Sequence, residues 1–274
     1  MFTENGLLRA LSDEDRNAIT PRLERIELQR GQVLEAPTRE IGYACFIETG
    51  LASVVALSPQ GEVGVGVAGY DGMTGIGILL GGGLPANETR VHAGGLGWAI
   101  AASDLRELQR DRPRLNDLLL RYVQVCLTQA SQNALCNSHA RMEEKLARWI
   151  LMSHDRFRGN DLTVTHEFIS LMLGVRRQGI TVAMHELEGE GLLKATRENI
   201  RILDRRGLIA RAAGAYGICE EEYERLIGPW RPHDGRSRNS GPRITAGFER
   251  KLGSRDNSSG RDDLRPETDR EVRG

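Results

Sequence analysis

The sequence has 274 residues, of which 39% are hydrophobic and only 5% aromatic, and its formal net charge is −1. This length is enough for one large or two ordinary domains with hydrophobic cores. No apolar run approaches the length of a membrane span, and the first residues lack the basic and then apolar pattern of a signal peptide. Four cysteines are scattered without a CxxC motif, so we expect a cytoplasmic protein in a reducing compartment.

Charge is distributed unevenly along the chain. Residues 1–112 contain ten Lys or Arg against fifteen Asp or Glu, a net charge of −5. Residues 141–211 contain thirteen against ten, or +3, and residues 229–274 contain eleven against eight, also +3. An acidic first half and a mildly basic second half are typical of a sensor joined to a DNA-binding unit, although a small basic surplus is common in other proteins too.

The first hundred residues predict a short helical segment and then many short strands. Residues 6–20 form an apolar face with Leu7, Leu8, Leu11 and Ile19, and Ser12 suits the start of a new helix. Short apolar runs then alternate with glycine-rich turns, at residues 40–47, 52–57, 63–67 and 91–101. This spacing predicts an antiparallel β-roll of the jelly-roll type.

Two other interpretations of this glycine-rich region are weaker. Residues 64–69 fit the pattern GxGxxG, but a dinucleotide site requires a helix immediately afterwards, and residues 70–75 have turn chemistry. A cupin-like metalloenzyme needs several histidines on its strands, whereas His92 is the only histidine between residues 26 and 101. We therefore expect neither a Rossmann fold nor a metal site.

Helical periodicity returns after residue 103. Residues 104–110 predict a short helix, and Pro113 suits the first turn of a long helix that extends to residue 137, where Asn137 and Ser138 interrupt it. Apolar residues cover more than one face of this long helix, so it must bury two faces. One face can pack on the β-roll and the other on a second copy of the helix; the alternative is a fully internal helix of a monomer.

The next predicted helix precedes a pair of short helices. Over residues 141–152 the pattern places apolar side chains inward and polar ones outward, the outward set being Arg141, Glu143, Glu144, Lys145 and Arg148. Residues 165–187 then predict two helices that meet at Gly174, since glycine adopts positive φ at little cost. Arg176, Arg177 and Gln178 begin the second helix, where such side chains can read base edges. Taken alone, this stretch equally fits an ordinary helical hairpin with a solvated basic turn.

The residues that follow favour DNA binding. Residues 191–195 and 200–203 predict two strands joined by a turn at residues 196–199, which is a wing directly after a helix-turn-helix. Asp204 can cap a helix over residues 205–213, and residues 220–226 predict another. Beyond Gly228 the chain is rich in Arg, Gly, Ser, Asp and Pro, so we expect a disordered tail over residues 229–274.

Several of these stretches resemble the Crp/Fnr superfamily of transcription regulators, in the branch common in alpha-proteobacteria; they are residues 134–139, 144–151, 165–187 and 200–208. The resemblance implies an α+β multidomain fold. It comprises a cyclic-nucleotide-binding-like β-roll over residues 1–112, a dimerisation helix over 113–137 and a winged helix-turn-helix over 138–228. It also implies a homodimer that binds a palindromic site in double-stranded DNA, with RNA polymerase as a candidate partner.

The resemblance carries over to the DNA-binding residues unevenly. Arg177 falls where the family places an arginine that reads guanine, but Gln178 stands where many members have glutamate, and Val182 replaces a second base-reading arginine. The half-site is therefore not expected to be the one that the cyclic AMP receptor protein reads. The full predicted DNA-binding set is Arg176, Arg177, Gln178, Thr181, Thr165, His166 and Arg197.

The residues at the family's effector-binding positions depart further from the family pattern. The turn that would hold a ribose is Gly75-Ile76-Gly77, without the family's carboxylate, and the phosphate clamp falls on Asn87 and Glu88. Glu88 would repel a phosphate, and only a shift of register onto Thr89 and Arg90 would avoid this. We therefore expect that cyclic AMP is not bound, and we predict no cofactor and no metal; the effector is unknown.

Cysteine and histidine ligands are also sparse. No cysteine precedes Cys45, so the clustered N-terminal cysteines of an iron–sulfur centre are lacking. One histidine or cysteine could suffice for haem, and nothing in the sequence favours it. Cys126 and Cys136 lie ten residues apart on one helix, which favours packing over a redox switch. Two other function classes stay open: a ligand-binding module without DNA function, and, more weakly, an enzyme for which no nucleophile–base pair is visible.

Overall fold

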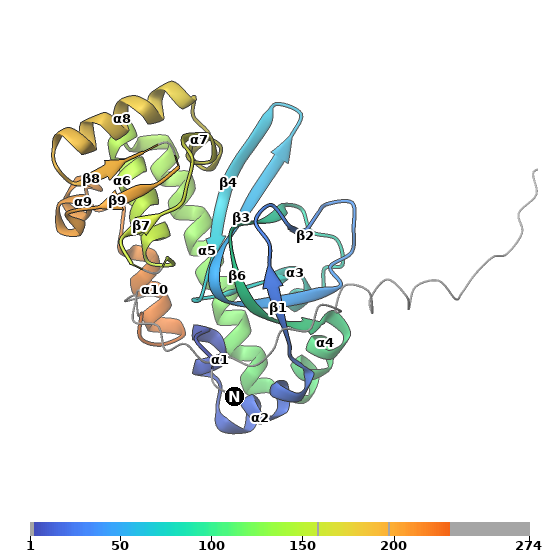
Figure 1. Ribbon diagram of the computed structural model, residues 1–274. Coiled ribbons are helices and arrows are strands. Elements are labelled where there is room, and N and C mark those ends of the chain that lie inside the picture. The colour runs from blue at the N-terminus through green and yellow to red at the C-terminus, as the bar shows by residue number, and fades with distance from the viewer. Residues whose placement is uncertain (1–2, 158, 197, 231–274) are drawn as a thin grey trace, which may run out of the picture.

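The computed structural model describes residues 3–157, 159–196 and 198–230. It has an antiparallel β-sheet in the N-terminal half, a long helix α5 (Pro113–His139), and a C-terminal unit of helices with a small sheet (Figure 1). The predicted α+β architecture is confirmed. No helix among the described residues is long and apolar enough to cross a membrane.

Two short helices cover the start of the chain, as the sequence predicts. Asn5 caps α1 (Gly6–Ala10) by accepting hydrogen bonds from Leu7 N and Leu8 N. Ser12 caps α2 (Asp13–Ile19), and the short 3-10 helix η1 (Thr20–Arg22) follows. The apolar side chains of both helices are buried against α5 and the sheet, which joins the N-terminus to the centre of the molecule.

The N-terminal sheet has six strands, all antiparallel, in the order β1-β6-β3-β4, with β2 on β6 and β5 on β3. The strands are β1 (Glu24–Leu28), β2 (Val33–Glu35), β3 (Tyr43–Ser58), β4 (Gly61–Ala68), β5 (Met73–Thr74) and β6 (Glu88–Ala101). The separate strands predicted at residues 40–47 and 52–57 are one strand, β3, whose register with β6 is irregular between Ile47 and Ala52. Such irregularities bend a strand. The bend lies at the mostly non-apolar residues that separate the two apolar runs in the sequence. Residues 64–68 of the GxGxxG segment lie in β4, and a turn rather than a helix follows at Gly69, so the Rossmann interpretation is excluded.

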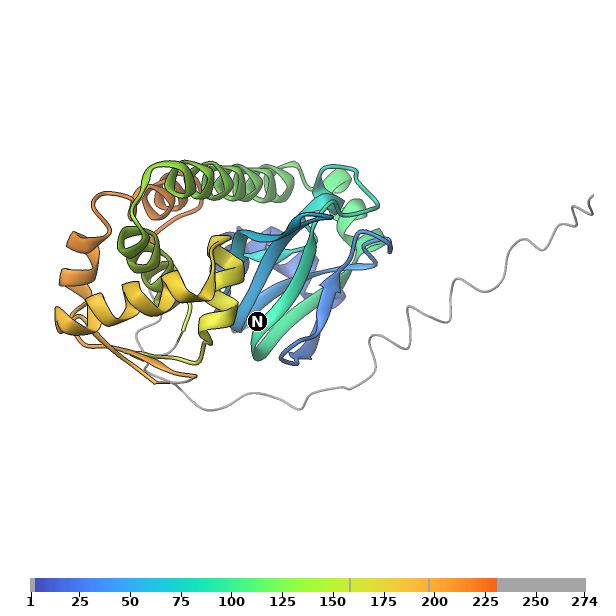
Figure 2. The same ribbon diagram turned by 90° about the horizontal axis from the view of Figure 1, so that it is seen from above.

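Helix α5 follows α3 (Ile76–Leu79) and α4 (Ala102–Asp111) and runs along one side of the molecule, with the β-strands on its inner side (Figure 2). Its inner face buries Leu115, Leu119 and Tyr122. Its outer face exposes three leucines, Leu120, Leu127 and Leu135. The predicted break at Asn137 and Ser138 is wrong: the helix continues to His139, and Ala140 leaves it with an extended ψ of 150°.

The C-terminal unit contains α6 (Met142–His154), β7 (Asp161–Leu162), α7 (His166–Leu173), α8 (Arg177–Gly189), β8 (Leu193–Ala195), β9 (Ile200–Ile202), α9 (Arg205–Arg211) and α10 (Ile218–Leu226). The predicted wing strands β8 and β9 are confirmed, and β7 adds a third strand in the order β7-β9-β8. Helix α9 ends at Arg211, two residues before the predicted end, and α10 packs against α5.

Two sequence-based expectations in this unit are corrected. Arg148, predicted to point outward, is buried with 5% exposure because its guanidinium donates hydrogen bonds to Asn133 Oδ1 and Ala215 O. Trp230, placed by sequence in the tail, packs edge-on against Tyr223. Residues 231–274, the rest of the predicted disordered tail, lie outside the described residues.

Candidate nucleic-acid interface

Helices α7 and α8 form the predicted helix-turn-helix. Thr165 caps α7, its hydroxyl accepting from Phe168 N at 3.2 Å. Gly174 ends the helix in the left-handed region, with φ 63° and ψ 36°, a conformation that favours glycine. The apolar faces of the two helices meet in the core of the C-terminal unit; they comprise Ile169, Met172, Leu173, Ile180, Ala183, Met184 and Leu187. The turn chemistry and the apolar spacing together therefore fix which face of α8 is left outward.

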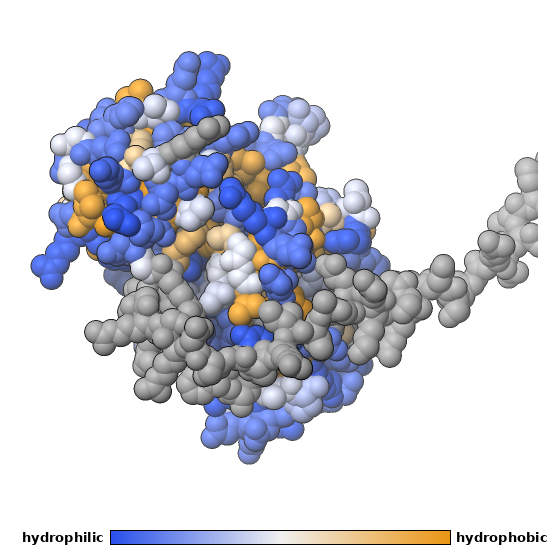
Figure 3. Space-filling model, in the orientation of Figure 1, coloured by the Kyte–Doolittle hydropathy of each residue, from blue (hydrophilic) through white to orange (hydrophobic). Residues whose placement is uncertain are grey.

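The outward face of α8 begins with the three residues predicted to read bases. Arg176 is the N-cap residue, Arg177 and Gln178 begin the helix, and all three are exposed. Across the described ranges of the chain, no hydrogen bond or ion pair holds the guanidinium of Arg176 or Arg177. Hydrophilic residues predominate on the surface over this part of the molecule (Figure 3). Two free guanidinium groups on the first turn of an exposed helix can approach phosphates or the O6 and N7 atoms of guanine.

The structure brings Thr181 and His166 to the same place. Thr181 Oγ1 lies 3.4 Å from His166 Nδ1 and also donates to Arg177 O at 3.2 Å. Burial, and then the positive charge of Arg177, lower the pKa of His166. Burial and the neighbouring arginine therefore both disfavour the charged form of His166, whose ring lies beside the start of α8.

The wing cannot be judged at its predicted contact, because Arg197 lies outside the described residues. The turn around it is closed by a hydrogen bond from Thr196 N to Asn199 O at 2.8 Å. Its neighbours Thr196 and Glu198 are exposed.

Several other arginines of this unit have carboxylate partners, which the sequence did not reveal. Arg201 pairs with Asp161 at 2.9 Å across the small sheet, and Arg211 pairs with Glu190 at 3.2 Å. Arg205 pairs with the fully buried Asp155, which also accepts from the Tyr216 hydroxyl. This pairing distinguishes structural arginines from Arg176 and Arg177, and Arg206 on α9 is also exposed without such a partner among the described residues.

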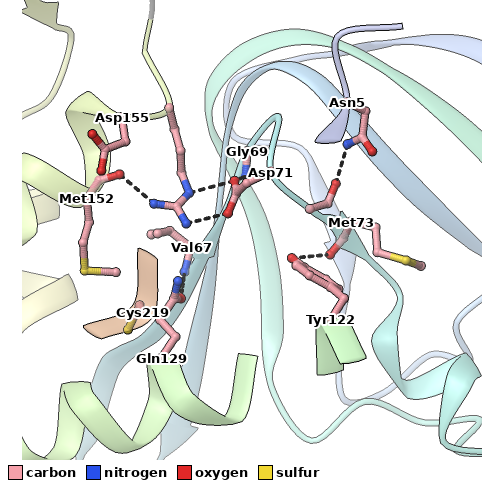
Figure 4. Close-up of polar contacts among 12 residues, drawn as sticks. Asn5, Val67, Gly69, Asp71, Met73, Tyr122, Gln129, Met152, Asp155 and Cys219 are labelled. Carbon is pink, nitrogen blue, oxygen red and sulfur yellow. Dashed lines mark hydrogen bonds and ion pairs between the residues drawn. The ribbon is translucent and has the colours of Figure 1, made fainter. Parts of the chain in front are cut away.

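A buried ion pair connects the C-terminal unit to the β-roll. Arg156, just after α6, forms two hydrogen bonds with Asp71, at 2.9 and 2.6 Å, and both side chains are 4% exposed (Figure 4). Arg156 also donates to Met152 O, and Asp71 accepts from Gly69 N. The pair is thus hydrogen-bonded to both units, so it helps to fix their relative position.

A second contact between the units lies at α7. The Phe168 ring stacks on His92 of β6, with the planes within 6° of parallel. Met172 packs over Gly64 of β4 so closely that a Cβ at position 64 would overlap it. Burial, and then the charge of Arg30, lower the pKa of His92 to about 4. A neutral imidazole therefore forms part of the surface on which the helix-turn-helix rests.

Most of the predicted effector residues line a cavity of about 350 Å³ between the sheet and α5. Gly75, Ile76, Gly77, Asn87 and Thr89 line it, whereas Glu88 and Arg90 do not. Glu88 and Arg90 form an ion pair with each other instead, and Arg90 is exposed. The register shift that would have put Arg90 at a phosphate is therefore not found, and the inward residue is Thr89.

The cysteines do not form a reactive or metal-binding site among the described residues. All four are free, and burial raises the pKa of the Cys126 thiol to about 12. No group of three or more His, Cys, Asp or Glu side chains in the described part of the chain could hold a metal ion.

Comparison with known proteins identifies the domain that carries this interface. Residues 144–211 match the family model of the Crp-like helix-turn-helix domain. The match spans α6 to α9 and includes both α7 and α8. No curated protein matches the sequence significantly.

Solved structures share the fold over roughly seven to eight tenths of this chain. A putative transcriptional regulator of the Crp/Fnr family from Eubacterium rectale superposes with a TM-score of 0.61 at 18% identity, covering 77% of this chain and 99% of that chain. FixK2 from Bradyrhizobium japonicum gives a TM-score of 0.61 at 14% identity, with 69% and 96% covered. The c-di-GMP-responsive regulator CLP from Xanthomonas campestris gives 0.57 at 16% identity, with 70% and 99% covered. The fold is therefore that of Crp/Fnr regulator structures.

Proposed function

We propose that this protein is a transcription regulator of the Crp/Fnr superfamily, in the branch common in alpha-proteobacteria, and that it binds DNA through α8. The observation that carries the proposal is the free, exposed pair Arg176 and Arg177 at the start of the second helix of a Crp-like helix-turn-helix domain. Arg177 reads guanine in the major groove, Gln178 contacts the neighbouring base, and Thr165, His166 and Thr181 lie toward the backbone. We propose no catalytic activity for this protein.

The proposed active form is a homodimer joined through α5. The outer face of this helix repeats Leu120 and Leu127 at a seven-residue interval, with the small residues Ser131, Ala134 and Ser138 continuing the exposed stripe. Such spacing suits two helices packed side by side. Two copies would present two α8 helices to successive major grooves about 34 Å apart, which calls for a palindromic site.

Selection of binding sites from random duplex DNA tests this proposal. We expect the selected sites to be palindromes whose half-sites are about one helical turn apart. We also expect binding to random duplex to weaken steeply as salt rises, because phosphate contacts release counterions. A protein that serves only as a ligand-binding module would enrich no site and would show no salt-dependent binding.

A further inference from the structure

The cavity beside α5 has walls from segments far apart in the sequence. Val65 and Val67 of β4 and Ile76 of α3 line one side, and Val123 and Gln129 of α5 line the other. Gln129 accepts a hydrogen bond from Val67 N at 2.7 Å, so the α5 wall is attached to the edge of the sheet (Figure 4). Its volume of about 350 Å³ falls in the range of roughly 300–1,000 Å³ found for small-molecule sites.

Exposed leucines lie at the opening of this cavity. Leu80 and Leu84 line it and are 63% and 62% exposed. Leu127 of α5 also lines it, but it belongs to the face proposed to pair in the homodimer. Scattered exposed leucines are common in proteins, but Leu80 and Leu84 beside one cavity form an apolar rim. The rim and the valine-rich walls together favour a ligand that buries apolar surface.

The charge of the cavity disfavours a phosphate ligand. No Lys, Arg or His is among the described residues that line it, so no cationic side chain of this lining would neutralise an anion. The lining does include the carboxyl group of Glu35, which accepts from Gly75 N at 2.9 Å and is hydrogen-bonded by Thr89. Burial raises the pKa of Glu35, against the opposing effect of these hydrogen bonds. An anion placed beside this group would lose hydration without gaining a partner.

We propose that this cavity binds an uncharged, mostly apolar small molecule with one hydrogen-bond donor, which Glu35 accepts. A carboxyl group has several acceptor positions, so Glu35 can take this bond and keep those from Gly75 and Thr89. Ligand binding here does not depend on the proposed DNA-binding function; only an effector role for the ligand would rest on that function.

Two related fluorescent probes test the proposal on the full-length protein without DNA. N-phenyl-1-naphthylamine is neutral, apolar and carries one N–H, and 8-anilinonaphthalene-1-sulfonate is the same framework with a negative charge. We expect the neutral probe to saturate one site per chain and to bind at least about tenfold more tightly than the sulfonate. We also expect that millimolar cyclic AMP does not displace it. Equal binding of the two probes, displacement by cyclic AMP, or no binding of the neutral probe would overturn the proposal.

Matched variants locate the probe. Leu84→Asp and Leu203→Asp each replace an exposed leucine, with 62% and 57% exposure, but only Leu84 lines the cavity. Because both side chains are on the surface, both variants should fold. We expect Leu84→Asp to weaken binding of the neutral probe about fivefold or more, and Leu203→Asp to leave it unchanged. Glu35→Gln, which keeps an oxygen acceptor but removes the charge, should reduce the preference for the neutral probe severalfold. Equal behaviour of the two leucine variants, or an unchanged preference in Glu35→Gln, would contradict the assignment.

Discussion

The outward face of α8 and the interior between the β-roll, α5 and α6 are built in opposite ways. The α8 face comes from consecutive residues, and its arginines Arg176 and Arg177 are exposed without ion pairs among the described residues. The interior is assembled from segments as distant as Asp71 and Arg156, and its charged groups are paired or hydrogen-bonded. From this difference we expect that substitutions on the α8 face alter what the protein binds. Substitutions in the interior should instead alter the stability of the contact between its two units.

The largest expected effect is in the interior. Asp71→Asn leaves the buried Arg156 cation without its counter-charge, and we expect a loss of about 3–5 kcal/mol in the free energy of unfolding. Asp161→Asn removes the partner of Arg201 in an exposed pair and should cost less than about 1 kcal/mol. Urea unfolding of both variants measures the difference. Equal losses would show that the buried pair Asp71–Arg156 contributes no more to the free energy of unfolding than the exposed pair.

The stacked pair His92–Phe168 predicts a pH dependence. An unfolded histidine takes up a proton near pH 6.5, whereas the pKa of His92 in the folded protein is lowered to about 4. Protons therefore favour unfolding or undocking between these values, and stability is lost as pH falls from about 6.5 to 4, by on the order of 1–3 kcal/mol.

The variant His92→Phe should lack this part of the pH dependence because its ring cannot be protonated. Urea unfolding of the wild type and the variant at pH 7 and pH 5 isolates the contribution of His92 from other titrating groups. If both proteins lost the same stability on acidification, His92 would not be the group responsible.

The outer face of α5 is intermediate between the exposed α8 face and the buried interior. It is exposed in one chain and is proposed to be buried in a dimer. Leu120→Arg should raise the dimer dissociation constant at least about tenfold, since it would place a charge in the helix pair. Leu203→Arg changes another exposed leucine, next to the wing, and should leave the constant unaltered. Sedimentation equilibrium measures both, and an unaffected dimer in Leu120→Arg would place the interface elsewhere.

The smallest effect is expected at Gln178. Glutamine can make two hydrogen bonds to adenine, whereas glutamate accepts from the amino group of cytosine, so Gln178→Glu should change the preferred base at one half-site position by about 1 kcal/mol. Because the side chain is exposed, the free energy of unfolding should not change. Competition between DNA sites that differ at this position measures the preference. If both proteins preferred the same base, Gln178 would not be the residue that reads it.

The same contrast explains what could be predicted from the sequence. Gly174, the apolar spacing around it and the strands of the wing are local features, so the helix-turn-helix and its outward residues followed from the chain alone. The partner of Arg156 lies in another domain, and nothing near Arg156 indicates it. The partners of Arg148, Asn133 and Ala215, are likewise distant from it in the sequence. In the β-roll, strand register decides which of Glu88, Thr89 and Arg90 points inward. A shift of one residue would place a charged side chain in the cavity instead of Thr89. Glu35 could not be foreseen there, since it comes from a separate strand.

Binding of Arg177→Ala to the selected palindrome and to random duplex DNA tests the central claim most directly. Arg206→Ala is the matched control, because Arg206 is also exposed but lies on α9. We expect Arg177→Ala to lose about 1–3 kcal/mol of binding to the palindrome per half-site and most of its preference over random DNA, with dimerisation unchanged. Arg206→Ala should keep the preference. If Arg177→Ala bound the palindrome as tightly and as selectively as the wild type, the outward face of α8 would not be the surface that reads DNA.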